Sequence, residues 1–272
     1  MKYVIDEKKK KLIDCIPDVE DYYLSETRPR IRVATQELDV VVPDGVERIA
    51  PTAFDRITTY VQTIELPDTV KILYAGQFKR LIAIEELKIG RGVSNIPAGL
   101  MHGNYSVKKV IIPDTVKIIH SSAFAECSNL ETVVIEGSGL EKIDSRAFWE
   151  CRNLKHINFP SSLKSIEREA FHHAGLEEIY FDHTVDFSWG WFGAFGFCNL
   201  KRYDAIFDDG RRIIRRWDSE GAATSELPAG NCIEVIIENG QKTTRCYDNR
   251  GRVVSEETVP YNSDCEDFPD SV

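Results

Sequence analysis

The sequence lacks the features that place a protein in a membrane or on nucleic acid. No stretch approaches the roughly 18 apolar residues of a membrane span, and the amino-terminal MKYVIDEKKKKLIDC has no continuous apolar core of a signal peptide. Basic residues are in deficit, with 34 Lys and Arg against 44 Asp and Glu and a net charge of -10. We therefore expect no membrane insertion and no nucleic-acid partner, and as written nothing directs the chain out of the cytoplasm.

Familiar catalytic and metal-binding patterns are also missing. The chain has no C-x-x-C pair, no HExxH, no GxSxG and no Walker loop. GWFGAFG, residues 190–196, has glycines at every third position but no nucleotide-binding context before it. Seven cysteines are an odd number, which excludes a complete set of internal disulfides. We expect no enzyme activity, no cofactor and no metal site.

What the sequence does contain is a repeat. The pattern I/L-x4-F recurs at steps of 23 or 24 residues, and its last position is occupied by Phe54, Phe78, Met101, Phe124, Phe148, Phe171 and Phe195. Each unit ends in a run of the type L-x2-I-x-I, whose period of two is typical of a short strand with one buried face. A single coil cannot bury its apolar columns, whereas stacked coils bury them against each other, so the pattern predicts a solenoid. Seven units at about 4.8 Å each give a rod of roughly 34 Å.

LPDTVKILYAGQF, IPDTVKIIHSSAFAECSNLETVVI and FPSSLKSIEREAF resemble the leucine-rich repeats of the BspA type, over about residues 40–205. The resemblance implies an α/β-type repeat solenoid: a curved, parallel-sheet leucine-rich repeat of about seven units of 23 or 24 residues. It also implies a non-enzymatic binding role, often adhesive, and a cell-surface or secreted location if a signal peptide was removed. The departures from the pattern are Met101 and a longer last unit, between Val185 and Phe195.

The two ends do not follow the repeat. Residues 1–39 read as an amino-terminal cap with a hairpin around the lysine run. Turn residues such as Asn239-Gly240 between β-prone runs predict a small antiparallel β region, a meander over residues 206–260. Within it, RRIIRRW divides its arginines between two faces, which favours a charge-protected edge strand over a phosphate site. Residues 261–272 are acidic and predicted to be disordered.

The cysteines and histidines fall into columns of the repeat. Cys127, Cys151 and Cys198 stand three residues after the aromatic position, where other copies have Ile57 or Leu81. Exchange with apolar residues predicts burial without chemistry. A disulfide between Cys127 and Cys151 would run along the stack and is disfavoured. His120 lies in a separate column of mixed polarity, which indicates surface.

Residues that alternate with the buried strand positions are predicted to line the outward face of the sheet. One column contains Thr63, Glu86, Lys109, Thr132, His156, Glu178 and Arg202, and the second contains Glu65, Lys88, Ile111, Val134, Asn158, Tyr180 and Asp204. Both vary from copy to copy while the core columns keep their type. That variation fits a recognition surface, and it fits drift on a solvated face.

The segment FSWGWFGAFGF, residues 187–197, is rich in aromatic residues. Trp189, Trp191 and Phe192 could form a platform for a sugar ring. The favoured interpretation is a lid on the open end of the stack.

The sequence therefore favours a monomeric, non-catalytic binding or adhesion protein whose strand face recognises a protein or glycan partner. The alternatives are an intracellular structural scaffold and a carbohydrate-binding protein that uses residues 187–197.

Overall fold

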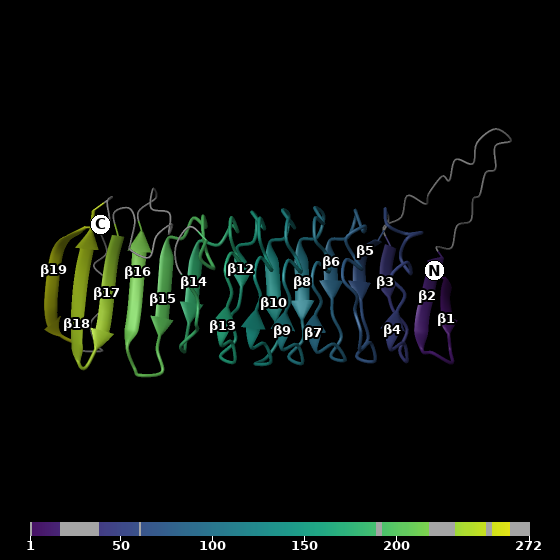
Figure 1. Cartoon of the computed structure of the whole chain (residues 1–272), viewed down its shortest axis with the longest axis horizontal. Coiled ribbons are helices and arrows are strands. Elements are labelled where there is room, and N and C mark those ends of the chain that lie inside the picture. The colour runs from purple at the N-terminus through teal and green to yellow at the C-terminus, as the bar shows by residue number, and fades with distance from the viewer. Residues whose placement is uncertain are drawn as a thin grey trace, which may run out of the picture.

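The structure, a computed structural model, describes residues 2–16, 38–59, 61–188, 192–217, 232–248 and 252–261. These residues form a solenoid of about seven turns with parallel sheets, followed by an antiparallel sheet (Figure 1). The described residues contain no helix, so none of them forms a helical membrane span. The predicted tail lies, apart from Tyr261, outside the described residues.

The first side of the solenoid is a parallel sheet of six strands in the order β12-β10-β8-β6-β5-β3. Each unit contributes one strand, and residues one repeat apart are direct neighbours, as with Thr132 beside Lys109. The strands are β3 (Leu38–Val41), β5 (Val61–Glu65), β6 (Glu86–Lys88), β8 (Lys109–Ile112), β10 (Thr132–Ile135) and β12 (His156–Ile157).

The second side is a row of two-residue strands, four of which form a parallel sheet. Single bridges, Arg48 with Ile72 and Ser165 with Asp186, mark the neighbouring coils on either side of it. The strands are β4 (Arg48–Ile49), β7 (Asn95–Ile96), β9 (Ile118–Ile119), β11 (Lys142–Ile143) and β13 (Ser165–Ile166).

The third side is the turn around the aromatic position, and here the expected α/β class is wrong. Ser122 and Glu126 have positive φ, 56° and 59°, so only the three residues between them can be right-handed, too few for a helix. The amides of Ser122, Phe124 and Glu126 donate instead to carbonyls of the next coil, at 3.2, 2.8 and 2.7 Å. Alternate amides, such as those of Ala123 and Ala125, close short turns within the coil, so this side combines turns with bonds between coils and contains no helix, which makes the described solenoid all-β.

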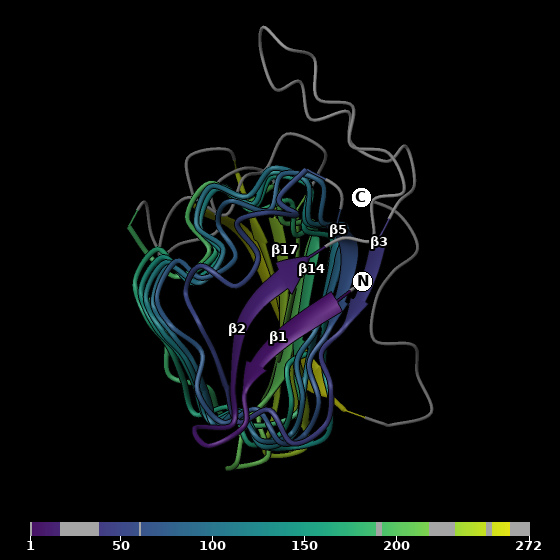
Figure 2. The ribbon, with the colours of Figure 1, turned by 90° about the vertical axis from the view of Figure 1, so that its right-hand side faces the viewer.

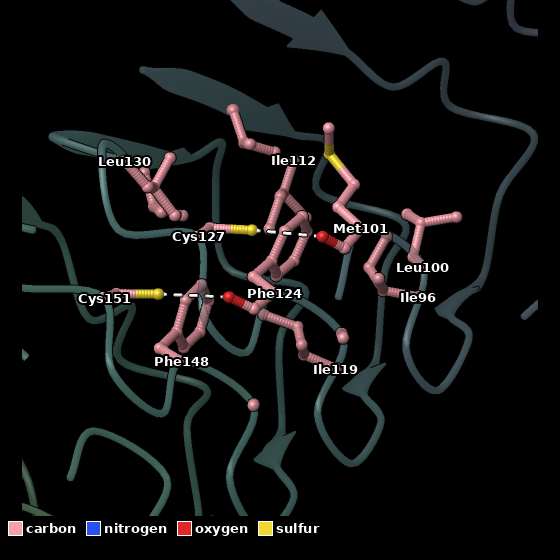
Figure 3. Close-up of a cluster of buried hydrophobic side chains, with 14 of the residues drawn as sticks. Ile96, Leu100, Met101, Ile112, Ile119, Phe124, Cys127, Leu130, Phe148 and Cys151 are labelled. Carbon is pink, nitrogen blue, oxygen red and sulfur yellow. Dashed lines mark hydrogen bonds between the residues drawn. The ribbon is translucent and has the colours of Figure 1, made fainter. Parts of the chain in front are cut away.

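The aromatic side chains stack inside the solenoid, one ring in each coil, alongside these backbone bonds between coils. The rings of Phe124, Phe148, Phe171 and Phe195 follow one another with centroids 5.3, 5.0 and 5.2 Å apart and planes within 9° of parallel. Figure 3 shows Phe124 and Phe148 among the buried side chains of their coils. Met101, also fully buried, takes the place of the ring in the preceding coil.

The stack is close to straight, whereas the resemblance implied a curved one. Seen along the axis, successive coils lie behind one another (Figure 2), and seen from the side their strands form a straight row (Figure 1).

At the amino-terminal end, β1 (Lys2–Asp6) and β2 (Lys11–Ile16) form an antiparallel hairpin. β2 also pairs in parallel with β4, which joins the hairpin to the second side of the solenoid. Leu12 and Cys15 on β2 are fully buried. Residues 17–37 lie outside the described residues.

At the other end, the predicted antiparallel sheet is present and continues directly from the solenoid. Its order is β14-β15-β16-β17-β18-β19, in which the first pair is parallel and the others antiparallel. Asn239 and Gly240, both with positive φ, form the tight turn between β17 and β18. The strands are β14 (Glu178–Phe181), β15 (Arg202–Ile206), β16 (Arg212–Trp217), β17 (Cys232–Glu238), β18 (Gln241–Tyr247) and β19 (Val253–Pro260).

The expectation that RRIIRRW is an edge strand is wrong. These residues form β16, which lies between β15 and β17. Arg215 donates to the buried carboxylate of Glu234 at 2.8 Å, and Tyr247 donates to the other oxygen of that carboxylate at 2.8 Å. The arginines of an interior strand thus satisfy carboxylates buried beside it.

Replacing Phe148 by alanine should test the aromatic stack. The ring is fully buried between two others, so we expect Phe148→Ala to lower the free energy of unfolding by about 3–5 kcal/mol. Guanidinium unfolding followed by circular dichroism measures the loss. The matched control is Phe192→Ala, because Phe192 is 62% exposed and its loss should cost under about 1 kcal/mol. Equal losses for both variants would contradict the stacking account.

Candidate partner-binding face

The predicted surface residues occupy the outward side of the strand row. We use the name strand face for this set, every member of which is exposed or half-buried. On the same strands, side chains that alternate with the set, such as Leu87, Val110 and Val133, are buried. The strand face consists of Thr63, Glu65, Glu86, Lys88, Lys109, Ile111, Thr132, Val134, His156, Asn158, Glu178, Tyr180 and Arg202.

In the amino-terminal half of the strand face, charges pair from coil to coil. Lys88 donates to Glu65 at 2.5 Å, and Lys109 lies 3.3 Å from Glu86. The hydrogen bond to Glu65 raises the pKa of the Lys88 ammonium above its ordinary value. These cations are already matched by neighbouring carboxylates, so this half presents little net positive charge to a partner.

The parallel sheet on the first side of the solenoid is not paired with the carboxy-terminal sheet that follows it. One sheet ends at β12 and the other begins at β14, although the two strands belong to successive coils. Asn158, just after β12, turns its side-chain amide onto β10: the carboxamide accepts from the amide of Ile135 at 2.9 Å and donates to its carbonyl at 2.7 Å. The side chain thus occupies the backbone groups that a longer β12 would pair with.

An open groove of about 410 Å³ lies at this break in the ladder. The aromatic ring of Tyr180, 54% exposed, and the carboxylate of Glu178 lie on one wall, from β14. Neither side chain makes a hydrogen bond or ion pair to the described residues. The groove is lined by Ile157, Asn158, Phe159, Glu178, Ile179, Tyr180, Arg202 and Asp204.

Asp204, predicted to point outward, is instead buried, with 3% of its surface exposed. Arg202 donates to its carboxylate at 2.9 Å, and Arg212 donates to both carboxylate oxygens at 2.9 Å. Burial alone would raise the pKa of Asp204, but the hydrogen bonds from Arg212 and Arg202 outweigh it, so its pKa lies below the ordinary value. Arg202 and Asp204 line the groove together with Glu178, so its charged side chains are of both signs.

A second groove, of about 570 Å³, lies where strands β3, β5 and β6 end. Asp44 and Asp68 stand in its wall together with Arg91, in the turns that follow the strands. The Asp68 carboxylate accepts a hydrogen bond from the backbone amide of Arg91 at 2.8 Å, and this bond stabilises the turn. This groove is therefore bounded by structural contacts of the coil turns.

The aromatic segment 187–197 falls into a buried part and an exposed part. Phe187 packs against Phe181, Phe195 and Tyr203, with centroids 5.7, 5.3 and 6.3 Å away. Phe192 is exposed, whereas Trp189 and Trp191 lie outside the described residues. The proposed platform therefore stays a prediction for its two tryptophans.

The cysteine and histidine columns are separate, as predicted. Cys127, Cys151 and Cys198 are fully buried free thiols, and each donates to a carbonyl of the preceding coil, as Figure 3 shows for the first two. His120 pairs instead with Asp144 of the next coil, at 2.9 Å. No cluster of three metal-ligating side chains occurs within the described ranges.

The break in the ladder is the feature that the sequence analysis missed. Its only signal is Asn158, a residue type depleted in strands, at a position where other copies have Ile111 or Val134. An outward position tolerates asparagine in many sheets, so this substitution alone does not predict that the amide would displace a ladder.

Comparison with known proteins points to one repeat family. The sequence model described as BspA type leucine rich repeat region matches residues 36–138 and 94–205, in six copies. No curated protein matches the chain.

Three solved structures are similar at low identity. A leucine-rich repeat protein from Eubacterium ventriosum is 20% identical, covers 63% of this chain and 50% of its own, and has a TM-score of 0.46. A leucine-rich repeat protein from Bacteroides ovatus is 20% identical, covers 67% of this chain and 58% of its own, and has a TM-score of 0.32. A leucine rich cell surface protein from Faecalibacterium prausnitzii is 17% identical, covers 79% of this chain and 56% of its own, and has a TM-score of 0.42. The chain thus spans between 50% and 58% of the length of these structures.

The buried thiols should be chemically silent in the folded protein. Burial raises the pKa of Cys127 and of Cys198 to about 12 and that of Cys151 well above its ordinary value, so all three remain protonated at pH 8. We expect iodoacetamide to leave them unlabelled in native protein and to label them in guanidinium, as mapped by mass spectrometry. The half-buried Cys246 serves as the internal comparison and should react first. Rapid labelling of Cys151 in native protein would contradict its burial.

Proposed function

This chain belongs to the BspA type leucine-rich repeat family, and we propose that it is a non-catalytic binding protein that recognises a protein or glycan through its strand face. The observation that carries the proposal is the groove between β12 and β14, where an exposed aromatic ring stands beside a fixed pair of arginines and a carboxylate that no described residue pairs with. Adhesion is the form of binding that the family resemblance favours.

The stacking contacts leave the strand face free for a partner. Coil-to-coil bonds run through the backbone, and the rings and thiols lie inside. Outward positions can therefore change without cost to the core, and solenoids present such surfaces to their ligands. The apolar side chains of Ile111 and Val134, neighbours in the ladder, add a half-buried patch that a partner could cover.

The groove has the chemistry of a neutral polar ligand rather than a polyanion. Tyr180 offers a flat apolar ring against which a sugar ring or an apolar side chain can pack. Glu178 can accept hydrogen bonds from hydroxyl or amide groups, and Arg202, oriented by the buried Asp204, can donate them. The carboxylates of Glu178 and Asp204 offset the guanidinium groups of Arg202 and Arg212, so the groove offers a polyanion no excess of positive charge, which supports a protein or glycan over nucleic acid.

A binding array of glycans and proteins, probed with the purified chain, should identify the partner, and variants then test the face. We expect Tyr180→Ala to weaken binding about 10-fold or more, since exposed aromatic residues that become buried contribute about 1–2 kcal/mol or more. Charge reversal at Lys88, Lys109 and Arg202 should also weaken it.

The matched control is Tyr105→Ala, because Tyr105 is a similarly exposed tyrosine, 64% exposed, that lies outside the strand face. Circular dichroism should be unchanged in both tyrosine variants. Full binding by Tyr180→Ala and by the charge-reversed variant, or equal losses for the two tyrosines, would remove the strand face from consideration.

A further inference from the structure

The last strand of the carboxy-terminal sheet is open on one side. β19 pairs antiparallel with β18 and is the final strand in the sheet order, at the end of the row in Figure 1. All eight of its residues, Val253–Pro260, are exposed. Neither face of the strand, therefore, is covered by the described residues.

An open edge strand presents unpaired backbone groups. In an antiparallel pair, alternate residues direct their N–H and C=O groups toward the neighbour, and the residues between them direct theirs outward. The outward groups of β19 are a template onto which another extended segment can pair. The β-branched side chains of Val253, Val254 and Val259, 49%, 64% and 40% exposed, favour that pairing.

The centre of this edge is acidic. Glu256 is matched by Arg245 of β18, whose guanidinium donates to it at 2.9 Å. Glu257 stands opposite Thr244, and no ion pair to it occurs in the described part of the chain. Among the described residues, therefore, one carboxylate at the middle of this edge has no counter-charge.

This charge decides between the segments that could pair there. A second copy, paired antiparallel through β19, would bring Glu256 and Glu257 of one chain against those of the other, and like charges across a strand pair are destabilising. The chain's own residues 262–272 carry Asp264, Glu266, Asp267 and Asp270, and they would be repelled for the same reason. A strand that carries a lysine or arginine would instead be attracted by these carboxylates and would avoid both repulsions.

We propose that the free edge of β19 docks an extended segment of another protein, with a lysine or arginine opposite Glu257 and β-branched residues beside it. The backbone ladder supplies the attachment and Glu257 supplies the selection. The same carboxylates keep copies of this chain from pairing edge to edge. This surface is distinct from the strand face, so it does not depend on the ligand of the groove.

The test uses labelled synthetic peptides and the full chain. One peptide of about ten residues alternates threonine and valine with a central lysine, and a second differs only by a central glutamate. We expect fluorescence anisotropy to show that the lysine peptide binds more tightly by roughly five-fold. N-methylation of alternate residues, in both possible phases, should abolish binding in one phase, because it removes the donors that reach the strand.

Charge exchange on the protein completes the test. Glu257→Lys should reverse the preference, so that the glutamate peptide binds more tightly. Lys79→Glu, at an exposed lysine outside both the strand face and β19, is the control and should leave the preference unchanged. Circular dichroism should match wild type for both variants, since both positions are at least partly exposed.

Three results would overturn the proposal. They are equal binding of the two peptides by wild-type protein, loss of binding with no reversal in Glu257→Lys, and sedimentation of the wild-type chain as a dimer that Glu257→Lys abolishes. The last result would mean that the edge is occupied by a second copy. None of them bears on the groove, whose binding is measured with Tyr180→Ala.

Discussion

The step from one coil to the next at the aromatic turn is the contact on which the rest of the molecule depends. The amide of Phe124, for example, donates to the carbonyl of Ala147 in the next coil at 2.8 Å, while its ring stacks on that of Phe148. The rings of Phe171 and Phe195 continue the stack. Strand spacing in a hydrogen-bonded sheet is about 4.8 Å, close to the spacing of stacked rings. Both contacts therefore favour the same rise, and residues of positive φ flank the rings of Phe124, Phe148 and Phe171 on both sides, where these bonds are made.

A fixed rise turns every repeat position into a column with one environment. Inward columns hold rings, thiols and aliphatic side chains, and outward columns bring charges one coil apart into contact, as in the pair of Lys88 with Glu65. Interruptions of the regular step are then informative. One ladder ends at β12, where Asn158 bonds back to β10 and a groove lies open beside it, and β19 is the last strand of its sheet in the described part of the chain. The two proposed binding surfaces are the two places where the repeat geometry stops.

Much of this arrangement can be predicted from the sequence because a repeat shows several different residues at each equivalent position, and their shared character reveals whether that position is buried. The buried ring positions, the buried cysteines and the outward strand residues were all predictable in this way. Predictions failed where a neighbour from outside the repeat, or the backbone conformation itself, decides the environment of a residue. Asp204 was assigned outward by its column, but Arg212 from the following strand draws it inward. The α/β class was implied by the family resemblance alone, and positive φ at Ser122 and Glu126, which rules out a helix there, cannot be read from those residue types.

The central claim is that one repeat is one coil, held to its neighbours by the same contacts at every step. Deletion of residues 117–140, which joins Val116 to the equivalent of the residue that normally follows it, tests this most directly. The account predicts that the shortened chain unfolds in guanidinium in a single cooperative transition and keeps the far-ultraviolet circular dichroism of strands. Deletion of residues 117–128, half a coil, should destroy both. A whole-coil deletion that is as disruptive as the half-coil deletion would contradict the account.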